Sequence, residues 1–276
     1  MRGLNNMEKL RDKKAFICDM DGVIYHGNRL LPGVKDFVEW LKTNGKQFLF
    51  LTNASERSLP ELQQKLQRLG ITVDVNRFYT SALATASFLS VHKPGGTAYV
   101  IGEAGLTNAL YEAGYSMNDI NPDYVVVGET RSYSFEKLEK AINMVMDGAK
   151  LVGTNPDLTD PVEKGLAPAT GALIAPIELA TGRKAYFVGK PNPMMMRHAL
   201  RHLGCTREDT AIIGDRMDTD IIAGINSDID TVLVLSGVTS REDLQRFAYH
   251  PRYILDGVID IPGSSDTNCK CSNFLL

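Results

Sequence analysis

Hydrophobic residues along this chain fall into two alternating patterns. Short, continuously apolar runs predict buried β-strands, and the first of them is Ala15–Cys18. Longer segments place apolar residues three and four positions apart on one helix face, as Val34, Phe37, Val38 and Leu41 do. Because the strand runs are apolar throughout, helices should cover both faces of a parallel sheet. The pattern predicts an α/β fold with a doubly wound parallel sheet.

The same two patterns predict the remaining elements. Further strands are expected at residues 47–51, 99–101, 124–127, 151–153, 186–188, 210–213, 231–235 and 253–255. Helices are expected at residues 59–69, 81–92, 103–113, 135–146, 173–181, 196–203, 221–225 and 241–247. Residues 25–33 contain glycine and proline and are expected to form a loop.

A dense group of helix- and strand-breaking residues divides this series. Residues 93–96 read Lys-Pro-Gly-Gly, and a second set of strands and helices begins after them. We expect the strand at 186–188 to return the chain to the first domain. The predicted division is a core formed by residues 1–94 and 184–262, an inserted α/β domain at 95–183, and a disordered tail at 263–276.

Composition restricts the class of protein. Of 276 residues, 43% are hydrophobic and 23% are charged, which suits a packed core. The net charge of −3 argues against a general nucleic-acid or membrane-surface binder, because such proteins usually carry a basic excess. The charged start of the chain lacks an apolar signal core, and no apolar run is long enough to span a membrane. A cytoplasmic protein is expected, with Cys269 and Cys271 in the polar tail.

Several predicted strands are followed directly by polar side chains that can carry chemistry. The carboxyl ends of parallel strands lie on one edge of a sheet, where open α/β sheets bind ligands. Alone, the pair of aspartates would fit a surface turn better than a catalytic site, so the prediction rests on all these side chains following strands together. These side chains are Asp19 and Asp21 after 15–18, Thr52 and Asn53 after 47–51, Lys190 after 186–188, and Asp215 and Asp220 after 210–213.

Together these groups suit phosphoryl transfer. One carboxylate can act as a nucleophile and a second as a general acid and base. A dianionic phosphate that meets a carboxylate needs positive charge, which a lysine, backbone N–H groups and a carboxylate-bound Mg²⁺ would supply. The strand ends therefore predict a magnesium-dependent site for a phosphorylated substrate.

Four segments at these strand ends match a known family. The segments D-M-D-G-V (19–23), L-T-N (51–53), G-K-P (189–191) and G-D-R-M-D-T-D (214–220) resemble the four motifs of the haloacid dehalogenase (HAD) superfamily of phosphatases. The segments G-T-N-P-D (153–157) and A-T-G-A (169–172) look characteristic of its NagD and nitrophenyl phosphatase subfamily. The resemblance spans about residues 15–261. It implies a Rossmann-like core with an α/β cap domain inserted between the second and third motifs.

The resemblance also implies roles for individual residues. Asp19 would be the nucleophile that becomes an aspartyl phosphate, and Asp21 the acid and base. Lys190 would orient Asp19 and, with Thr52 and Asn53, bind the phosphoryl group. The Mg²⁺ ligands would be carboxylates of Asp19 and Asp215 and the backbone carbonyl of Asp21, supported by Asp220 in a second layer. Asp218 is expected to be a solvated helix N-cap.

Three functions remain open from the sequence. The first is a phosphatase for small phosphomonoesters, such as UMP and other nucleotide monophosphates, sugar phosphates or nitrophenyl phosphate. The second is a receiver-like signalling protein that accepts a phosphoryl group, and the third is a binding protein on an inactive phosphatase fold. Asp21 and the long insertion favour the phosphatase. Its partner would be a small phosphorylated metabolite, a homo-oligomer remains possible, and Tyr133, Asn155 and Asp157 are candidate cap contacts or structural residues.

Overall fold

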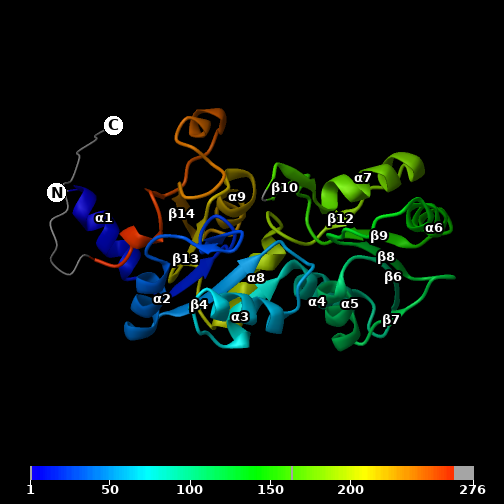
Figure 1. Cartoon of the computed structure of the whole chain (residues 1–276), viewed down its shortest axis with the longest axis horizontal. Helices are drawn as coiled ribbons and strands as arrows, with labels where there is room; N and C mark the ends of the chain where they lie inside the picture. The colour runs from blue at the N-terminus through cyan, green and yellow to red at the C-terminus, as the bar shows by residue number, and fades with distance from the viewer. Residues whose placement is uncertain (1, 163, 264–276) are drawn as a thin grey trace.

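The computed structural model describes residues 2–162 and 164–263, which form two lobes side by side (Figure 1). Each lobe is built on one parallel sheet. The first lobe contains the two ends of the described chain, and the second, green in Figure 1, contains its middle. The expected doubly wound α/β fold with an inserted α/β domain is confirmed. In the described part of the chain, no helix has both the length and the apolar character needed to cross a bilayer.

The first sheet places β1 at its centre. Its strands follow the order β15-β14-β13-β1-β4-β5, and all neighbours are parallel. Cys18, the last residue of β1, is level with Ile213 of β13 and Phe50 of β4, so the three strands end within two residues of one another. The strand bounds are β1 Ala15–Cys18, β4 Gln47–Thr52, β5 Phe78–Thr80, β13 Thr210–Gly214, β14 Asp230–Val234 and β15 Tyr253–Leu255.

Helices pack on this sheet through the apolar faces that the sequence predicts. In α2 (Val34–Thr43), the buried residues are Val34, Phe37, Val38 and Leu41. The other α-helices are α1 Arg2–Arg11, α3 Leu59–Arg68, α4 Ser81–His92, α5 Ala104–Glu112, α6 Phe135–Met146, α7 Thr170–Thr181, α8 Pro193–Leu203 and α9 Ile222–Ile225.

The second lobe has a five-stranded parallel sheet in the order β12-β9-β8-β6-β7. One prediction is corrected here: Tyr186–Phe187 forms β12, which pairs with β9 of this sheet and not with the first one. The apolar run at 186–188 could indicate a strand but not its sheet. The chain therefore returns to the first lobe only after Phe187. The strand bounds are β6 Thr97–Ile101, β7 Ser116–Met117, β8 Tyr124–Val127, β9 Lys150–Gly153 and β12 Tyr186–Phe187.

Several short elements differ from the prediction. The expected loop at 25–33 contains a hairpin of β2 (Tyr25–His26) and β3 (Arg29–Leu30), and a second hairpin joins β10 (Thr159–Pro161) to β11 (Leu166–Pro168). The helix expected at 241–247 is a short 3₁₀ turn, Asp243–Arg246. There the Ser240 hydroxyl and backbone N–H both donate to Asp243, which favours a turn over a longer helix. The expected disordered tail, with Cys269 and Cys271, lies outside the described residues apart from Gly263.

The two lobes share buried apolar residues. Leu49 and Leu51 of β4 belong to the same buried cluster as Val126 of β8 and Val152 of β9. The backbones also meet closely, because the Gly105 N–H at the start of α5 donates to the carbonyl of Glu56, 3.1 Å away. A Cβ at Gly105 would stand 2.6 Å from backbone atoms of the first lobe, so this contact requires glycine. The inserted lobe is thus packed on the core beside the strand ends.

Candidate active site

The carboxyl end of β1 carries Asp19 into the edge of the first sheet. Its backbone N–H donates to the carbonyl of Ile213 at 2.8 Å, which extends the β1–β13 pairing by one residue. Its side chain is only 13% exposed. Because β13 ends at the same level, Asp215 and Asp220 of the following segment lie beside it. Carboxylate oxygens of Asp19, Asp215 and Asp220 all fall within 4.8 Å of one another.

Lys190 supplies a cation inside this carboxylate cluster. Its buried Nζ donates to Asp19 Oδ1 at 2.5 Å and to Asp220 Oδ1 at 2.6 Å. Burial alone would lower the pKa of Lys190, but the two carboxylates outweigh it and raise that pKa above its ordinary value. For Asp19, burial raises the pKa against the attraction of Lys190, and the charges of Asp220 and Asp215 raise it further. One lysine therefore leaves the cluster with excess negative charge.

Asp215 is held between two backbone segments. Its Oδ2 accepts from the Val238 N–H at 2.7 Å. A Cβ on Gly22 would stand 2.4 Å from that oxygen, and one on Gly237 would stand 2.0 Å from it, so both positions need glycine. Burial and the nearby Asp220 raise the pKa of Asp215 to about 7. Loops following β1 and β14 thus fix this carboxylate at the strand ends.

The hydrogen bonds indicate which oxygens could bind a metal. Asp220 uses both oxygens within the protein, since Oδ1 accepts from Lys190 and Oδ2 from the Arg216 N–H at 3.1 Å. Among residues 2–162 and 164–263, Asp19 Oδ2 and Asp215 Oδ1 accept no hydrogen bond from protein donors. Free carboxylate oxygens amid excess negative charge are suitable ligands for a hard divalent cation. The donor set therefore fits Mg²⁺, with Asp220 in a supporting position.

Asp21 stands apart from this cluster. Its side chain is 63% exposed, and Oδ1 lies 3.8 Å from His26 Nδ1. The surrounding protein limits its hydration and raises its pKa, although the charges of Lys65, His26 and Arg57 oppose the rise. A partly exposed carboxyl group with a raised pKa can hold and release a proton more readily than an ordinary aspartate.

The segment after β4 presents Thr52 and Asn53. The Thr52 Oγ1 accepts from the Ala54 N–H at 3.1 Å. The side chain of Asn53 is committed to structural bonds: Nδ2 donates to Asp157 Oδ2 at 2.8 Å and to the Lys190 carbonyl at 3.0 Å. Its Oδ1 accepts from the Lys190 N–H at 2.8 Å. Asn53 therefore positions the backbone of Lys190, and a phosphate contact from Asn53 would come from its backbone N–H.

The three candidate cap contacts all form bonds within the protein. The Tyr133 hydroxyl donates to the Leu173 carbonyl at 2.7 Å inside the second lobe. Asn155 Nδ2 donates to the Asn53 carbonyl at 2.8 Å, and Asp157 accepts from Asn53. The geometry therefore favours a structural role for these three residues over contact with the substrate. Asn155 and Asp157 join the second lobe to the segment after β4.

Asp218 is exposed, as expected, but it is not a helix N-cap. It lies within a π-helical turn, Met217–Ile221, whose N-cap position is Arg216. Both carboxylate oxygens accept from the Arg216 guanidinium at 3.1 Å. Arg216 Nη2 also lies 3.7 Å from Asp157 Oδ1, so it connects the segment after β13 to the second lobe.

Sequence reasoning missed two acidic residues of the second lobe whose pKa values are raised. Glu129 accepts from Asn155 Nδ2 at 2.8 Å and from the Ser55 N–H at 3.2 Å, and burial with the charge of Asp160 raises its pKa to about 8. Asp160, in β10, has a pKa raised to about 6 by burial and by Asp157. Glu129 follows the strand at 124–127 by two residues, as Lys190 follows 186–188, so its place after a strand was a signal in the sequence. Asp160 lies in a short hairpin, and only the folded arrangement identifies it.

Two family models match this chain. One, described as haloacid dehalogenase-like hydrolase, covers residues 16–116, and a second HAD hydrolase-like model covers residues 187–261. A dihydroxyacetone phosphatase of Corynebacterium glutamicum is 43% identical over 247 residues, with 90% of each chain covered. The chain belongs to the HAD-like hydrolases. More closely, it is a NagD-like phosphatase: the ribonucleotide monophosphatase NagD of Escherichia coli is 42% identical, covering 90% of this chain and 98% of NagD.

Solved structures of other HAD phosphatases have the same fold. The structure of E. coli NagD superposes with a TM-score of 0.85 over 90% of this chain and 98% of that one. A 4-nitrophenylphosphatase from Thermotoga maritima, 33% identical, has a TM-score of 0.89 over 92% of this chain and 97% of that one. Both lobes therefore belong to the HAD phosphatase architecture, and the chain is a phosphatase.

Proposed function

We propose that this HAD phosphatase hydrolyses small phosphomonoesters with the aid of Mg²⁺ and through an aspartyl phosphate on Asp19. The observation that carries the proposal is the buried arrangement of Asp19 beside Lys190, Asp215 and Asp220. Lys190 orients the Asp19 carboxylate through Oδ1, so that one oxygen can attack phosphorus while the other remains for the metal. The exposed Asp21 and the inserted lobe match a phosphatase better than a receiver, which needs neither a second acid nor an enclosed substrate.

The residues that would hold Mg²⁺ are Asp19 and Asp215, through their free oxygens, and Asp21 through its backbone carbonyl. Asp220 supports them while it also binds Lys190. When bound, the ion offsets the repulsion between the carboxylates and the phosphate. Lys190 and backbone N–H groups near Thr52 and Asn53 bind the remaining phosphate oxygens.

The reaction has two steps, formation of the aspartyl phosphate and its hydrolysis. In the first, a carboxylate oxygen of Asp19 forms a bond to phosphorus while the bond from phosphorus to the ester oxygen breaks, and the protonated Asp21 donates its proton to the leaving oxygen. In the second, Asp21 accepts a proton from water as the water oxygen attacks phosphorus. The bond to Asp19 then breaks, which releases inorganic phosphate and restores the Asp19 carboxylate.

The substrate class follows from the relatives and the cleft. The names of the relatives include a ribonucleotide monophosphatase, a dihydroxyacetone phosphatase and an acid sugar phosphatase. We therefore propose a small phosphorylated metabolite, among them UMP and other nucleotide monophosphates, sugar phosphates and nitrophenyl phosphate. We place the enzyme in the cytoplasm, with the inserted lobe, from about residue 95 to Phe187, acting as a cap that contacts the leaving group.

The two aspartates can be tested separately with 4-nitrophenyl phosphate. Nitrophenolate leaves without protonation, so Asp21→Asn should still form the aspartyl phosphate but hydrolyse it slowly. Rapid mixing should show a nitrophenol burst close to one per active site, followed by a slow steady rate. Mass measurement of the quenched protein should find the phosphoryl group on Asp19.

The control is Asp19→Asn, which lacks the anionic oxygen and should give no burst. With an alkyl phosphate, Asp21→Asn should also give no burst, because the alkoxide must be protonated as it leaves. A burst from Asp19→Asn, or a phosphoryl group on another residue, would overturn the assignment of Asp19.

A further inference from the structure

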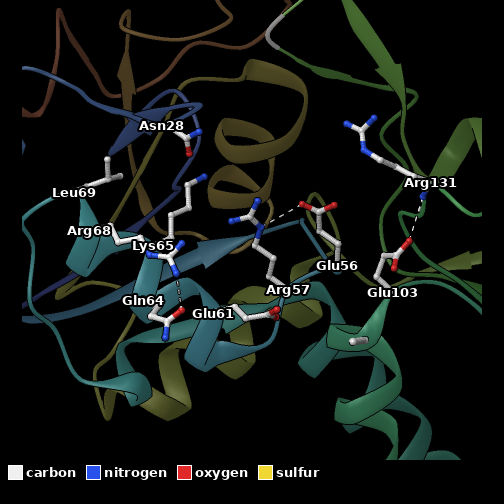
Figure 2. A pocket seen from close by; sticks show the side chains of 11 residues that line it. Asn28, Glu56, Arg57, Glu61, Gln64, Lys65, Arg68, Leu69, Glu103 and Arg131 are labelled. Atoms are coloured by element: carbon white, nitrogen blue, oxygen red, sulfur yellow. Dashed lines mark hydrogen bonds and ion pairs between the residues drawn. The ribbon is translucent and has the colours of Figure 1, made fainter.

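A cleft of about 920 Å³ lies between α3 of the first lobe and the start of α5 in the second. Figure 2 shows its lining side chains, with Lys65 and Arg57 on the core side and Arg131 on the opposite side. None of the residues in the strand-end cluster lines this cleft. It is nevertheless close to the reacting end, because Lys65 Nζ lies 3.5 Å from the centre of the Tyr25 ring, and the Tyr25 backbone pairs with that of Asp21.

Carboxylates also line the cleft, but the protein already engages them. Glu61 accepts from the Ser58 N–H at 2.7 Å and from its hydroxyl at 2.8 Å, as the capping box of α3. Glu103 accepts from the Thr130 hydroxyl at 2.7 Å and from the Arg131 N–H at 3.2 Å. These bonds hold the acidic groups in place and leave the cationic side chains to face the open space.

Arg57 and Arg131 differ in how strongly the protein holds them. Arg57 contacts Glu56 through Nε at 3.4 Å, while both residues stay substantially exposed. The Arg131 side chain projects from the second lobe toward the cleft (Figure 2) and forms no ion pair within the described residues. Both guanidinium groups can therefore turn toward an anion without breaking a buried bond.

Lys65 is a half-buried cation that faces an aromatic ring. Its Nζ lies 3.5 Å from the centre of the Tyr25 ring, and no carboxylate oxygen of residues 2–162 or 164–263 lies within 4 Å of it. Partial burial and the like charge of Arg57 lower the pKa of Lys65 to about 8, against the attraction of Asp21 and Glu56. A half-buried ammonium group of this kind gains more from an anion than a fully solvated one does.

We propose that Lys65, with Arg57 and Arg131, binds a second anionic group on the leaving portion of the substrate. The preferred substrates are then phosphomonoesters that also carry a carboxylate or another phosphate. This inference rests on the proposed phosphatase function and specifies its substrate class. Since α3 carries Lys65 while Arg131 belongs to the second lobe, such a substrate bridges the lobes while its ester phosphate lies at Asp19.

The test compares matched substrates that differ only in the second anion. Alkyl phosphates of increasing chain length are each paired with the carboxyalkyl phosphate and the alkanediol bisphosphate of the same length. The measured quantity is kcat/KM for the anionic ester divided by kcat/KM for the neutral ester of the same length. A substitution that slows catalysis in general lowers both values and leaves this ratio unchanged. At one chain length we expect a ratio of about tenfold or more, the value of one charge-assisted hydrogen bond.

The variants assign this preference to individual side chains. The ratio should approach unity in Lys65→Met, or in Lys65→Gln if the methionine variant does not fold, and Lys65→Arg should recover most of it. Arg131→Met should lower the ratio as well. The matched control is Lys35→Met, which removes an exposed lysine of α2 and should leave the ratio unchanged. If the carboxyalkyl phosphates give the larger ratio, the preferred second anion is a carboxylate; if the bisphosphates do, it is a phosphate.

The failures are distinguishable. A ratio near unity at every length in the unmodified enzyme, or an unchanged ratio in Lys65→Met, overturns the second-anion site while the neutral esters still turn over. No turnover of any ester would instead contradict the proposed phosphatase function.

Discussion

Lys190 and Lys65 lie at opposite ends of the same functional region and differ in their surroundings. Lys190 is buried between two carboxylates, 2.5 and 2.6 Å from their oxygens, and its pKa is raised. Lys65 is half-buried against the Tyr25 ring, no carboxylate of the described part of the chain lies within 4 Å of it, and its pKa is lowered to about 8. In both cases burial acts to lower the pKa, so the partners decide the direction.

The difference separates two tasks. At the strand ends, the protein supplies more negative than positive charge, which favours a divalent cation. The bond from Lys190 also holds the Asp19 carboxylate in place. In the cleft between the lobes, a cation lacks a counter-charge, which favours an anion brought by the substrate. The first arrangement suits chemistry common to all substrates, and the second suits discrimination among them.

Metal removal should have the largest effect on the strand-end region. With excess chelator, phosphate release should fall below about a thousandth of its initial rate, because the carboxylates and phosphate then repel one another. Added Mg²⁺ should restore the rate, and Zn²⁺ should restore it poorly at a site made of oxygen ligands. Undiminished phosphate release in chelator would rule out the metal.

Replacement of Lys190 by Met should have the next largest effect. It leaves Asp19 and Asp220 buried together, and we expect a loss of about 3 kcal/mol in the free energy of unfolding, together with loss of activity. The stability deficit should shrink as the pH falls from neutral, because protonation of a carboxyl group removes the repulsion. Urea unfolding at several pH values measures it.

The matched control is Lys184→Met, since Lys184 pairs with Glu178 while its side chain is 85% exposed. A surface pair of this kind should contribute little to stability. Equal losses in the two variants would contradict the special importance of the Lys190 cluster.

The smallest effect should come from Lys65→Met and should have the opposite sign. The pKa of Lys65 is lowered to about 8 in the folded chain. Between that pH and the ordinary lysine pKa, the unfolded chain therefore binds more protons than the folded chain. The free energy of unfolding of the unmodified protein rises with pH over this interval. The variant should therefore be more stable by about 1 kcal/mol near pH 7, and this gain should vanish at higher pH. Thermal unfolding from pH 7 to 10 measures the difference, and a gain independent of pH would contradict the lowered pKa.

Strand prediction succeeded where a continuous apolar run was enough to show that a strand is present. Ala15–Cys18 is buried on both faces, so its four apolar residues and the Asp after it placed the start of the site. The run at 186–188 was assigned to the wrong sheet because short apolar strands do not specify their neighbours. Very short strands such as Ser116–Met117, with one exposed and one half-buried residue, carry no apolar run that could be detected.

The candidate site was predictable only as a set of motifs. The sequence placed Asp19, Lys190 and Asp215 at strand ends, but it could not show that the Asn53 side chain is engaged by Asp157. Likewise, Gln64, Lys65 and Arg68 lie on the polar face of α3, which looks like an ordinary solvated surface until the second lobe is placed opposite it. Contacts between segments distant in sequence account for what was missed.

The bond between Asn53 and Asp157 has a consequence for how this family can be recombined. Asn53 Nδ2 donates one hydrogen to Asp157 of the second lobe and the other to the Lys190 carbonyl, so one amide couples the inserted lobe to Lys190. A transplanted insert from a relative would need an acceptor at the position of Asp157 to keep this geometry. The insert is therefore not an interchangeable module, and chimeras should be joined so that residues 53 and 157 come from the same parent.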